Sequence, residues 1–208
     1  KLADIGINRF SIGVQSFIDS ELLFLSRVHN SLQAIESVKI ANDITDNVSV
    51  DFIYALQNQK LNDLEFNITK IEELKLNHVS AYSLILEKGT LIYKQLEKNK
   101  ELEFAEKDSD VFYEYISSRL NDLNLKQYEV SNFSKKGFKS RHNLKYWNFE
   151  PYLGLGPSSH SFINNKRFVN VKSVTQYISK LNSNQLPIKE KNDLTLLQLK
   201  NDYFISVF

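Results

Sequence analysis

The chain has 208 residues, of which 42% are hydrophobic and 25% are charged, the composition of an ordinary globular protein. Its 26 lysines and arginines nearly balance 25 aspartates and glutamates, so the formal net charge is only +1. This balance argues against a binding surface for nucleic acid or anionic membrane, because such binding needs clustered, uncompensated positive charge.

The first half of the chain alternates predicted strands with predicted helices. Short runs rich in β-branched and aromatic residues predict buried strands at residues 9–14, 48–54 and 78–84. Apolar residues at helical spacing predict helices at residues 19–27, 31–41, 61–74 and 109–123. This alternation indicates βαβ crossovers and a parallel sheet, with an unpaired edge at the first strand that favours self-association.

The character of the sequence changes near residue 127. Short segments dense in aromatic residues follow, and we expect strands and loops at residues 128–133, 140–147, 152–162 and 166–171. Helical patterns close the chain at residues 173–181 and 194–208. We therefore predict an α/β fold in two parts: a partial barrel with parallel strands at residues 1–126, and a smaller aromatic-rich α+β segment at residues 127–208.

Cysteine and methionine are both absent. Without a thiolate, these residues cannot bind a cysteine-ligated iron–sulfur cluster or zinc ion. The chain begins with Lys1, and its last helical pattern reaches Phe208 without a stop signal, so we expect an internal part of a longer protein. No signal peptide or apolar run of about 20 residues is visible, which predicts a cytoplasmic protein without a transmembrane segment.

Four separated strings carry a family resemblance: GINRFSIGVQSF, VDFIYALQNQ, HVSAYSLILEKGT and YEVSNFSKKGFKSRHNLKYWNFEPYLGLGPSSHSF. In this order and spacing they resemble the oxygen-independent coproporphyrinogen III oxidase family of radical S-adenosylmethionine (SAM) proteins, and most of all its heme-chaperone branch. The resemblance covers nearly the whole chain. It implies a partial TIM-like barrel and a 4Fe–4S cluster held by a CxxxCxxC loop that this sequence does not contain. Ala55 and Gln57 stand where the family has glycine and proline, so the resemblance leaves the shape of the loop that they occupy open.

The resemblance implies that Gln15, Arg27 and Asp51 contact the methionine and ribose parts of SAM, with the backbone of residues 83–85 beside the nucleoside. A carboxamide both donates and accepts hydrogen bonds, and a guanidinium pairs with a carboxylate. Each residue also has a structural interpretation: Gln15 as a loop cap, Arg27 as a solvated or ion-paired cation, and Asp51 as a brace between strands. In this family the cluster reduces SAM to form a radical, so we expect the chain alone to be inactive as an enzyme.

An H-N-x-x-Y-W string resembles the heme-chaperone branch more than the oxidases. Its members are His142, Asn143, Tyr146 and Trp147. A neutral imidazole can ligate heme iron and aromatic rings can stack on a porphyrin, so His142 is a candidate iron ligand. In a strand His142 and Tyr146 would share one side, with Trp147 on the other. Alternatively, the tryptophan anchors a core and the His–Asn pair links loops by hydrogen bonds.

For the remaining histidines and the glycine pair, a structural role is preferred to a role in ligand binding. Gly154 and Gly156 form a lone GxG, which is weak evidence for a phosphate loop, and we expect tight turns there. His160 could bond a propionate, although a role in the core is the preferred interpretation. His29 and His78 are predicted to be structural.

Three functions stay open at this point. The first is a heme chaperone that binds heme or porphyrin and SAM and delivers heme to accepting proteins. The second is anaerobic decarboxylation of coproporphyrinogen III in porphyrin biosynthesis. The third is a structural α/β domain that binds nothing by itself. Heme titration and product formation separate them.

Overall fold

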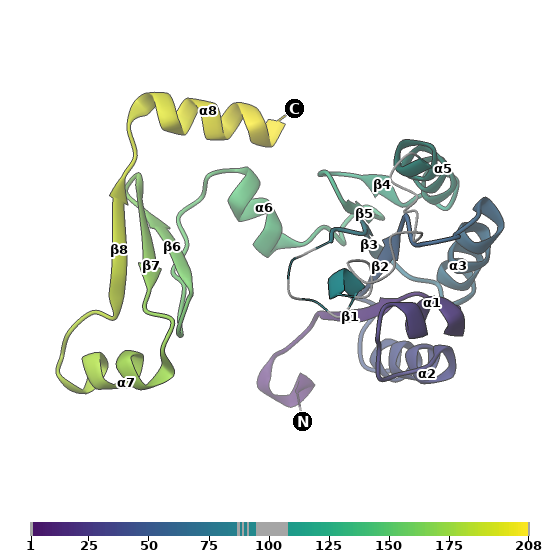
Figure 1. The fold of residues 1–208 in the computed structure, drawn as a ribbon, viewed down its shortest axis with the longest axis horizontal. Helices are drawn as coiled ribbons and strands as arrows, with labels where there is room; N and C mark the ends of the chain where they lie inside the picture. Colours follow the sequence, from purple (N-terminus) through teal and green to yellow (C-terminus); the bar gives the residue numbers. More distant parts are fainter. Residues whose placement is uncertain (1, 87, 89, 91, 95–107, 208) are drawn as a thin grey trace. The chain divides into compact units, whose positions relative to one another are not determined.

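The computed structural model describes residues 2–86, 88, 90, 92–94 and 108–207 (Figure 1). Contacts divide the chain into two compact units, residues 1–139 and residues 140–208, which we describe separately. The elements of the first unit are η1 (Ala3–Ile5), β1 (Phe10–Gln15), α1 (Asp19–Phe24), α2 (Ser31–Asn42), β2 (Val48–Tyr54), α3 (Leu61–Glu73), β3 (His78–Ser83), α5 (Ser109–Asp122), β4 (Lys126–Gln127) and β5 (Asn132–Ser134).

The first unit is built on a mixed sheet with the strand order β1-β2-β3-β5-β4. β1, β2 and β3 are parallel, whereas β5 is antiparallel to β3 and β4 is antiparallel to β5. Figure 1 shows helices α1, α2, α3 and α5 gathered along one face of this sheet. The predicted α/β fold with parallel strands is confirmed, and β1 is an edge strand of the described sheet, as expected.

The core lies between the sheet and these helices. In α3 the residues Leu64, Ile68 and Ile71 are buried, and their spacing places them on one side of the helix. Phe112 and Ile116 do the same for α5. Burial of one such side chain contributes about 1.5–3 kcal/mol, so the apolar stripes decide which helix face meets the sheet.

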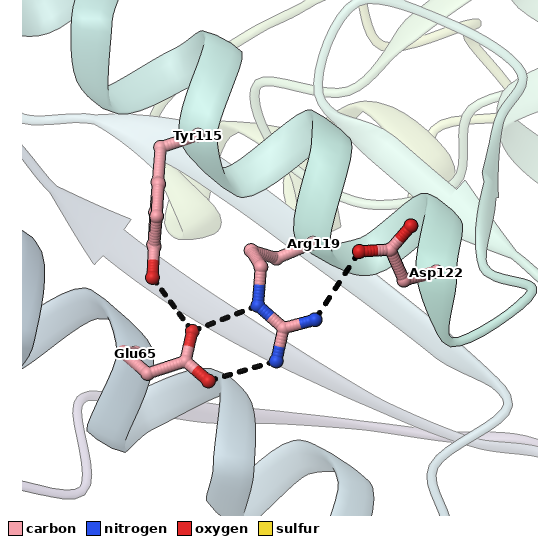
Figure 2. Close-up of polar contacts among 4 residues, drawn as sticks. All are labelled: Glu65, Tyr115, Arg119 and Asp122. Atoms are coloured by element: carbon pink, nitrogen blue, oxygen red, sulfur yellow. Dashed lines mark hydrogen bonds and ion pairs between the residues drawn. The ribbon is translucent and has the colours of Figure 1, made fainter.

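An ion pair joins α3 to α5 outside this core (Figure 2). Arg119 donates from Nη2 to Glu65 Oε1 at 2.7 Å and from Nε to Glu65 Oε2 at 2.9 Å, a two-point contact. Tyr115 donates its hydroxyl to Glu65 Oε2 at 2.7 Å. These bonds, first of all those from Arg119 and Tyr115, lower the pKa of Glu65 to about 2.

The second unit holds an antiparallel sheet with the order β6-β7-β8. Its elements are α6 (Arg141–Trp147), β6 (His160–Ile163), β7 (Lys166–Asn170), α7 (Val174–Asn182), β8 (Ile188–Asp193) and α8 (Leu196–Val207). Asn164 and Asn165, with φ of 51° and 60°, form the two-residue turn between β6 and β7. Positive φ at both positions gives the type I′ turn that matches the twist of a hairpin, and asparagine tolerates it.

Two local predictions for this region are wrong or incomplete. Residues 140–147, expected as strand and loop, form helix α6, because Ser140 caps it by accepting a hydrogen bond from the backbone N–H of Asn143. Strand β8 was not predicted, since its exposed, charged sequence has no apolar alternation. β4 and β5 belong to the first sheet although they follow residue 126, and the functional division at that residue stays a prediction. No helix in the described ranges is long and apolar enough to cross a membrane.

The Glu65–Arg119 contact gives a first testable prediction. Arg119→Lys removes the two-point geometry, so the pKa of Glu65 should rise from about 2 toward its ordinary value, with only a small loss of stability for a partly exposed pair. Carboxyl ¹³C chemical shifts followed against pH measure the change. Arg167→Lys, which alters the Arg167–Asp202 pair of the other unit, is the control and should leave Glu65 unchanged. An unaltered Glu65 titration in Arg119→Lys would contradict the assignment.

Candidate functional site

The sheet of the first unit has a polar face opposite the helices. Along β2, Val48, Val50 and Phe52 enter the core, so the intervening side chains lie on the other face. We call this the polar face; its polar members on β1, β2, β3 and β5 include Ser11, Ser49, Asp51, His78, Ser80 and Asn132. Strand register places Asp51 beside Ser80 and Ser80 beside Asn132, which forms a polar row across the sheet.

Short hydrogen bonds fix the middle of the polar face. Ser80 donates to Asn132 Oδ1 at 2.6 Å, and Ser11 donates to Asp51 Oδ1 at 3.2 Å. Asp51 is half-buried and makes no ion pair among the described residues. Its carboxylate therefore retains capacity to accept further hydrogen bonds.

His78 closes the amino-terminal end of the polar face. Its Nδ1 lies 2.7 Å from Ser49 Oγ and its Nε2 lies 2.7 Å from the hydroxyl of Tyr128. Burial lowers the pKa of His78 to about 3, with a further lowering from the positive charge of Arg9. The imidazole is therefore neutral at pH 7, and both nitrogens are engaged, as suits the structural role expected for it.

Gln15 ends β1 in an unusual backbone conformation. Its φ is 67°, and the N–H of Ser16 donates to the carbonyl of Val14 at 2.9 Å, which makes a three-residue γ-turn. The pairing of β1 with β2 shifts between Ile12 and Gln15, where one extra residue is inserted. Positive φ is costly for a residue with a side chain, and such strain concentrates at functional positions.

The carboxamide of Gln15 folds back onto the polar face. A Cβ atom placed on Gly13 would lie 2.7 Å from Gln15 Nε2, so glycine leaves the space that the carboxamide occupies. Val14 is in the core, so its neighbour Gly13 lies on the opposite face of the strand, the same face as Ser11. Gln15 and Asp51 therefore share the polar face.

A buried carboxylate holds the loop that follows Gln15. Glu21, on α1, accepts from Ser16 Oγ and from Asn67 Nδ2, the latter at 3.2 Å. Its other oxygen accepts from Gln59 Nε2 at 2.7 Å, and Asn67 Oδ1 accepts from the N–H of Phe17 at 2.6 Å. The loops after β1 and β2 are thus tied to α1 and α3 by one satisfied network.

The other predicted SAM contacts are Arg27 and the backbone of residues 83–85. Arg27 is exposed in the turn after α1, and no hydrogen bond or ion pair of its guanidinium occurs within the described part of the chain. Ser83 ends β3, and the N–H of Leu84 donates to the carbonyl of Tyr54 at 2.9 Å, so residues 83–85 follow the carboxyl ends of β2 and β3. Gln15 lies at the same edge because β1–β3 are parallel. Among the described residues, no hydrogen bond or ion pair joins Arg27 to Gln15 or to residues 83–85.

The H-N-x-x-Y-W string lies on α6 of the second unit. Tyr146 OH is 2.9 Å from His142 Nε2, and the two rings meet edge to face with centroids 5.1 Å apart. They share a side because four residues are about one helical turn, not because of strand geometry as expected. Tyr146 also packs on Tyr152, with ring centroids 4.5 Å apart. Trp147 is half-buried, so it is no deep core anchor.

The glycine pair has the structural role that was predicted. A Cβ on Gly154 would lie 2.1 Å from the carbonyl oxygen of His160, and Gly156 has a φ of 100°. Asn170 Nδ2 donates to the carbonyl of Gly156 at 3.1 Å, and the Gly156 N–H donates to Tyr177 OH at 3.0 Å. The loop is therefore satisfied internally. The preferred core interpretation of His160 is wrong, because that side chain is exposed.

A cavity of about 310 Å³ lies beside this loop within the second unit. Apolar side chains dominate its lining, among them Leu155, Phe168, Leu181 and Leu186. Its size and apolar character are those of a small-molecule pocket. The polar groups on its lining, such as Asn170, are already hydrogen-bonded within the unit.

Comparison with known structures defines the class of fold. The coproporphyrinogen III oxidase HemN from Escherichia coli, described as a radical SAM enzyme, superposes with a TM-score of 0.79 at 18% identity. The alignment covers 99% of this chain and 50% of that chain, so the two share the radical SAM partial-barrel fold. No family model matches the sequence.

Curated relatives give the family. The heme chaperone HemW of Bacillus subtilis is 35% identical over 209 residues, covering 99% of this chain and 55% of the relative. HemW of Lactococcus lactis is 37% identical over 179 residues, 85% of this chain and 47% of the relative. The mitochondrial radical SAM domain-containing protein 1 of Dictyostelium discoideum is 34% identical over 205 residues, 88% of this chain and 46% of the relative. The chain belongs to the HemN/HemW family of radical SAM proteins and spans about half the length of these relatives.

Sequence reasoning missed two features of the site. Glu21 looked like an ordinary helix acid, and only its position among apolar residues of α1 signals burial. Tyr82 lies on the polar face two residues after Ser80. Burial is the main cause of its raised pKa, and the negative charges of Asp51 and Glu129 are smaller causes. Alternation along β3 could have found it.

The buried histidine predicts a pH dependence of stability. The unfolded state binds a proton near the ordinary pKa of His78, whereas the folded state resists protonation down to a pKa of about 3. Stability is therefore full above the unfolded pKa and falls as the pH is lowered, by about 2 kcal/mol from pH 7 to pH 5. Urea unfolding measures this. His78→Asn should flatten the slope, and exposed His160→Asn should keep it; equal slopes in all three proteins would refute the prediction.

The γ-turn predicts that glycine at position 15 does not destabilise the fold. Gln15→Gly relieves the positive-φ strain, so the free energy of unfolding should stay equal or rise by about 1 kcal/mol. Gln57→Gly, at a loop glutamine outside the positive-φ residues, should lower it by increasing the entropy of the unfolded chain. Thermal unfolding compares the two. If Gln15→Gly destabilises as much as Gln57→Gly, the turn is not strained.

Proposed function

We propose that this chain supplies part of a SAM-binding half-barrel and a heme-binding unit to a heme chaperone of the radical SAM class. The observation that carries the proposal is the similarity to HemW along 99% of the chain. The aromatic surface around His142 and the polar face around Gln15 and Asp51 support it.

The polar face has the chemistry to hold the organic part of SAM. The Gln15 carboxamide can donate to and accept from ligand groups, and Asp51 can accept from hydroxyl or ammonium groups. Arg27, exposed and without a described partner for its guanidinium, is free to pair with the ligand carboxylate. Bound SAM supplies radical chemistry only when a cluster reduces it. The residues of this chain do not fit such a cluster, because they include no cysteine.

The heme part of the proposal rests on α6. The imidazole of His142 is exposed, and Tyr146 and Tyr152 offer adjacent ring surface to a porphyrin. Ligation of iron through Nε2 requires the Tyr146 hydroxyl to release that nitrogen. The exposed placement suits a protein that binds heme transiently and passes it to an accepting protein, whereas a permanent heme site would be enclosed.

Anaerobic decarboxylation of coproporphyrinogen III is the second candidate function. The shared fold with HemN favours it, but an identity of 18% supports the fold alone. The relatives at 34–37% identity are named as heme chaperones or as a radical SAM domain-containing protein, not as oxidases. Conversion of the porphyrinogen by a protein that also holds a cluster and SAM would favour this candidate.

Heme titration tests the proposed chaperone function. Wild-type protein should give a Soret band shifted from that of free heme, and His142→Ala should lose it. His160→Ala, another exposed histidine of the second unit, is the control and should bind normally. Tyr146→Phe removes the hydroxyl that holds Nε2, so it should bind heme at least as tightly as wild type. Identical spectra for wild type and His142→Ala would overturn the assignment of the ligand.

A further inference from the structure

The hairpin between β4 and β5 brings an additional carboxylate to the polar face. The N–H of Tyr128 donates to the carbonyl of Asn132 at 3.1 Å and closes the loop that contains Glu129. The N–H of Ala81 donates to the carbonyl of Ser131 at 2.8 Å, which fastens this loop to β3. Because β5 runs antiparallel to β3, the loop lies toward the carboxyl end of β3, the edge where β1 ends at Gln15.

One carboxylate oxygen of Glu129 accepts no hydrogen bond from the described residues. The Oε1 atom is buried and has no hydrogen-bond partner within the described part of the chain. A buried carboxylate oxygen without a donor is costly, so nearly all such groups in folded proteins have a partner. The loop itself does not need this carboxylate, because Gln127 Nε2 donates to the carbonyl of Val130 at 3.2 Å and the backbone bonds above close the turn.

Tyr82 links Glu129 to the site already described. Its side chain is 42% exposed and belongs to the polar face. Among the smaller causes of its raised pKa are the charges of Asp51 and Glu129. Ser131, two residues after Glu129, accepts from the N–H of Ala81. Ala81 follows Ser80, which is paired with Asp51 on β2, so the loop borders the polar row.

We infer that Glu129 is a ligand-binding residue whose unpartnered Oε1 accepts a hydrogen bond from a hydroxyl or ammonium group of the nucleoside ligand. This inference rests on the proposed SAM site and deepens it. A carboxylate can only accept, so its partner must be a donor, and a charged acceptor binds a donor more strongly than a neutral one. The ribose hydroxyls and the amino group of S-adenosylmethionine or S-adenosylhomocysteine belong to this class.

Calorimetric titration with S-adenosylhomocysteine tests the inference. Glu129→Gln keeps the shape but removes the charge, so the Kd should rise about tenfold, and Glu129→Ala should raise it further. Thermal stability should be equal or higher in Glu129→Gln, because the buried oxygen without a donor no longer belongs to a charged group. Loss of binding with gain of stability separates a ligand contact from a structural role. Glu114→Gln, at an exposed glutamate of α5, is the matched control and should change neither quantity.

The outcomes distinguish this inference from the proposed function. If wild type binds and Asp51→Asn weakens binding while Glu129→Gln matches Glu114→Gln, the inference is overturned and the SAM site stands. If wild type fails to bind, or Gln15→Gly and Asp51→Asn leave the Kd unchanged, the proposed site itself fails. Adenosine and methionine as separate probes then show which donor Glu129 meets, since only one of them should lose affinity in Glu129→Gln.

Discussion

The buried carboxylate of Glu21 fixes the edge of the sheet on which the candidate site depends. One of its oxygens meets Ser16 and Asn67, and the other meets Gln59. These partners come from the loop after β1, from α3 and from the loop after β2, so the network joins segments that are distant in sequence. Because a carboxylate left without donors in the interior is very costly, this arrangement is effectively all or none. The loop after Gln15 therefore has one defined path, and the strain at Gln15 can persist.

The opposite end of the polar face is fixed by different chemistry. His78 is held between Ser49 and Tyr128 by neutral hydrogen bonds, and its lowered pKa keeps it neutral. The middle row of Asp51, Ser80 and Asn132 lies between two rigid ends. Rigid surroundings matter for binding, because a preformed site does not spend interaction energy on ordering its own side chains.

The sequence predicted the elements whose signals are local and periodic. The strand at residues 48–54 agrees with β2, and the helix predicted at residues 61–74 agrees with α3 to within one residue at its end. Residues of the apolar core recur at every second position in β2 and at helical spacing in α3. Helix α6 was not predicted, because its aromatic residues favour strands and its start depends on one cap at Ser140. The extra residue in β1 and the positive φ of Gln15 arise from tertiary contacts, which no periodicity encodes.

Family membership was predictable from the strings of residues, whereas the roles of Gln15 and Asp51 in SAM binding stay predictions. The buried network could not be predicted, because Ser16, Glu21 and Asn67 are separated by up to 51 positions. Ala55 stands where the family pattern has glycine, and its φ is 60°. Glycine adopts this conformation more readily than alanine does. Here the chain retains a strained backbone with a less suitable residue, so the packing around the loop must determine its shape.

The polar face carries charged groups of both signs. Lys139 Nζ lies 5.4 Å from the ring centroid of Tyr128, and the charge of Arg9 acts on both Tyr128 and Asp51. The charges of Asp51 and Glu129 act on the phenol of Tyr82. Carboxylates accept hydrogen bonds only, so a ligand with a donor such as an ammonium group is favoured beside Asp51. At His78 burial is the main cause of the lowered pKa, and the positive charge of Arg9 lowers it further, so the imidazole stays neutral and adds no positive charge to this face.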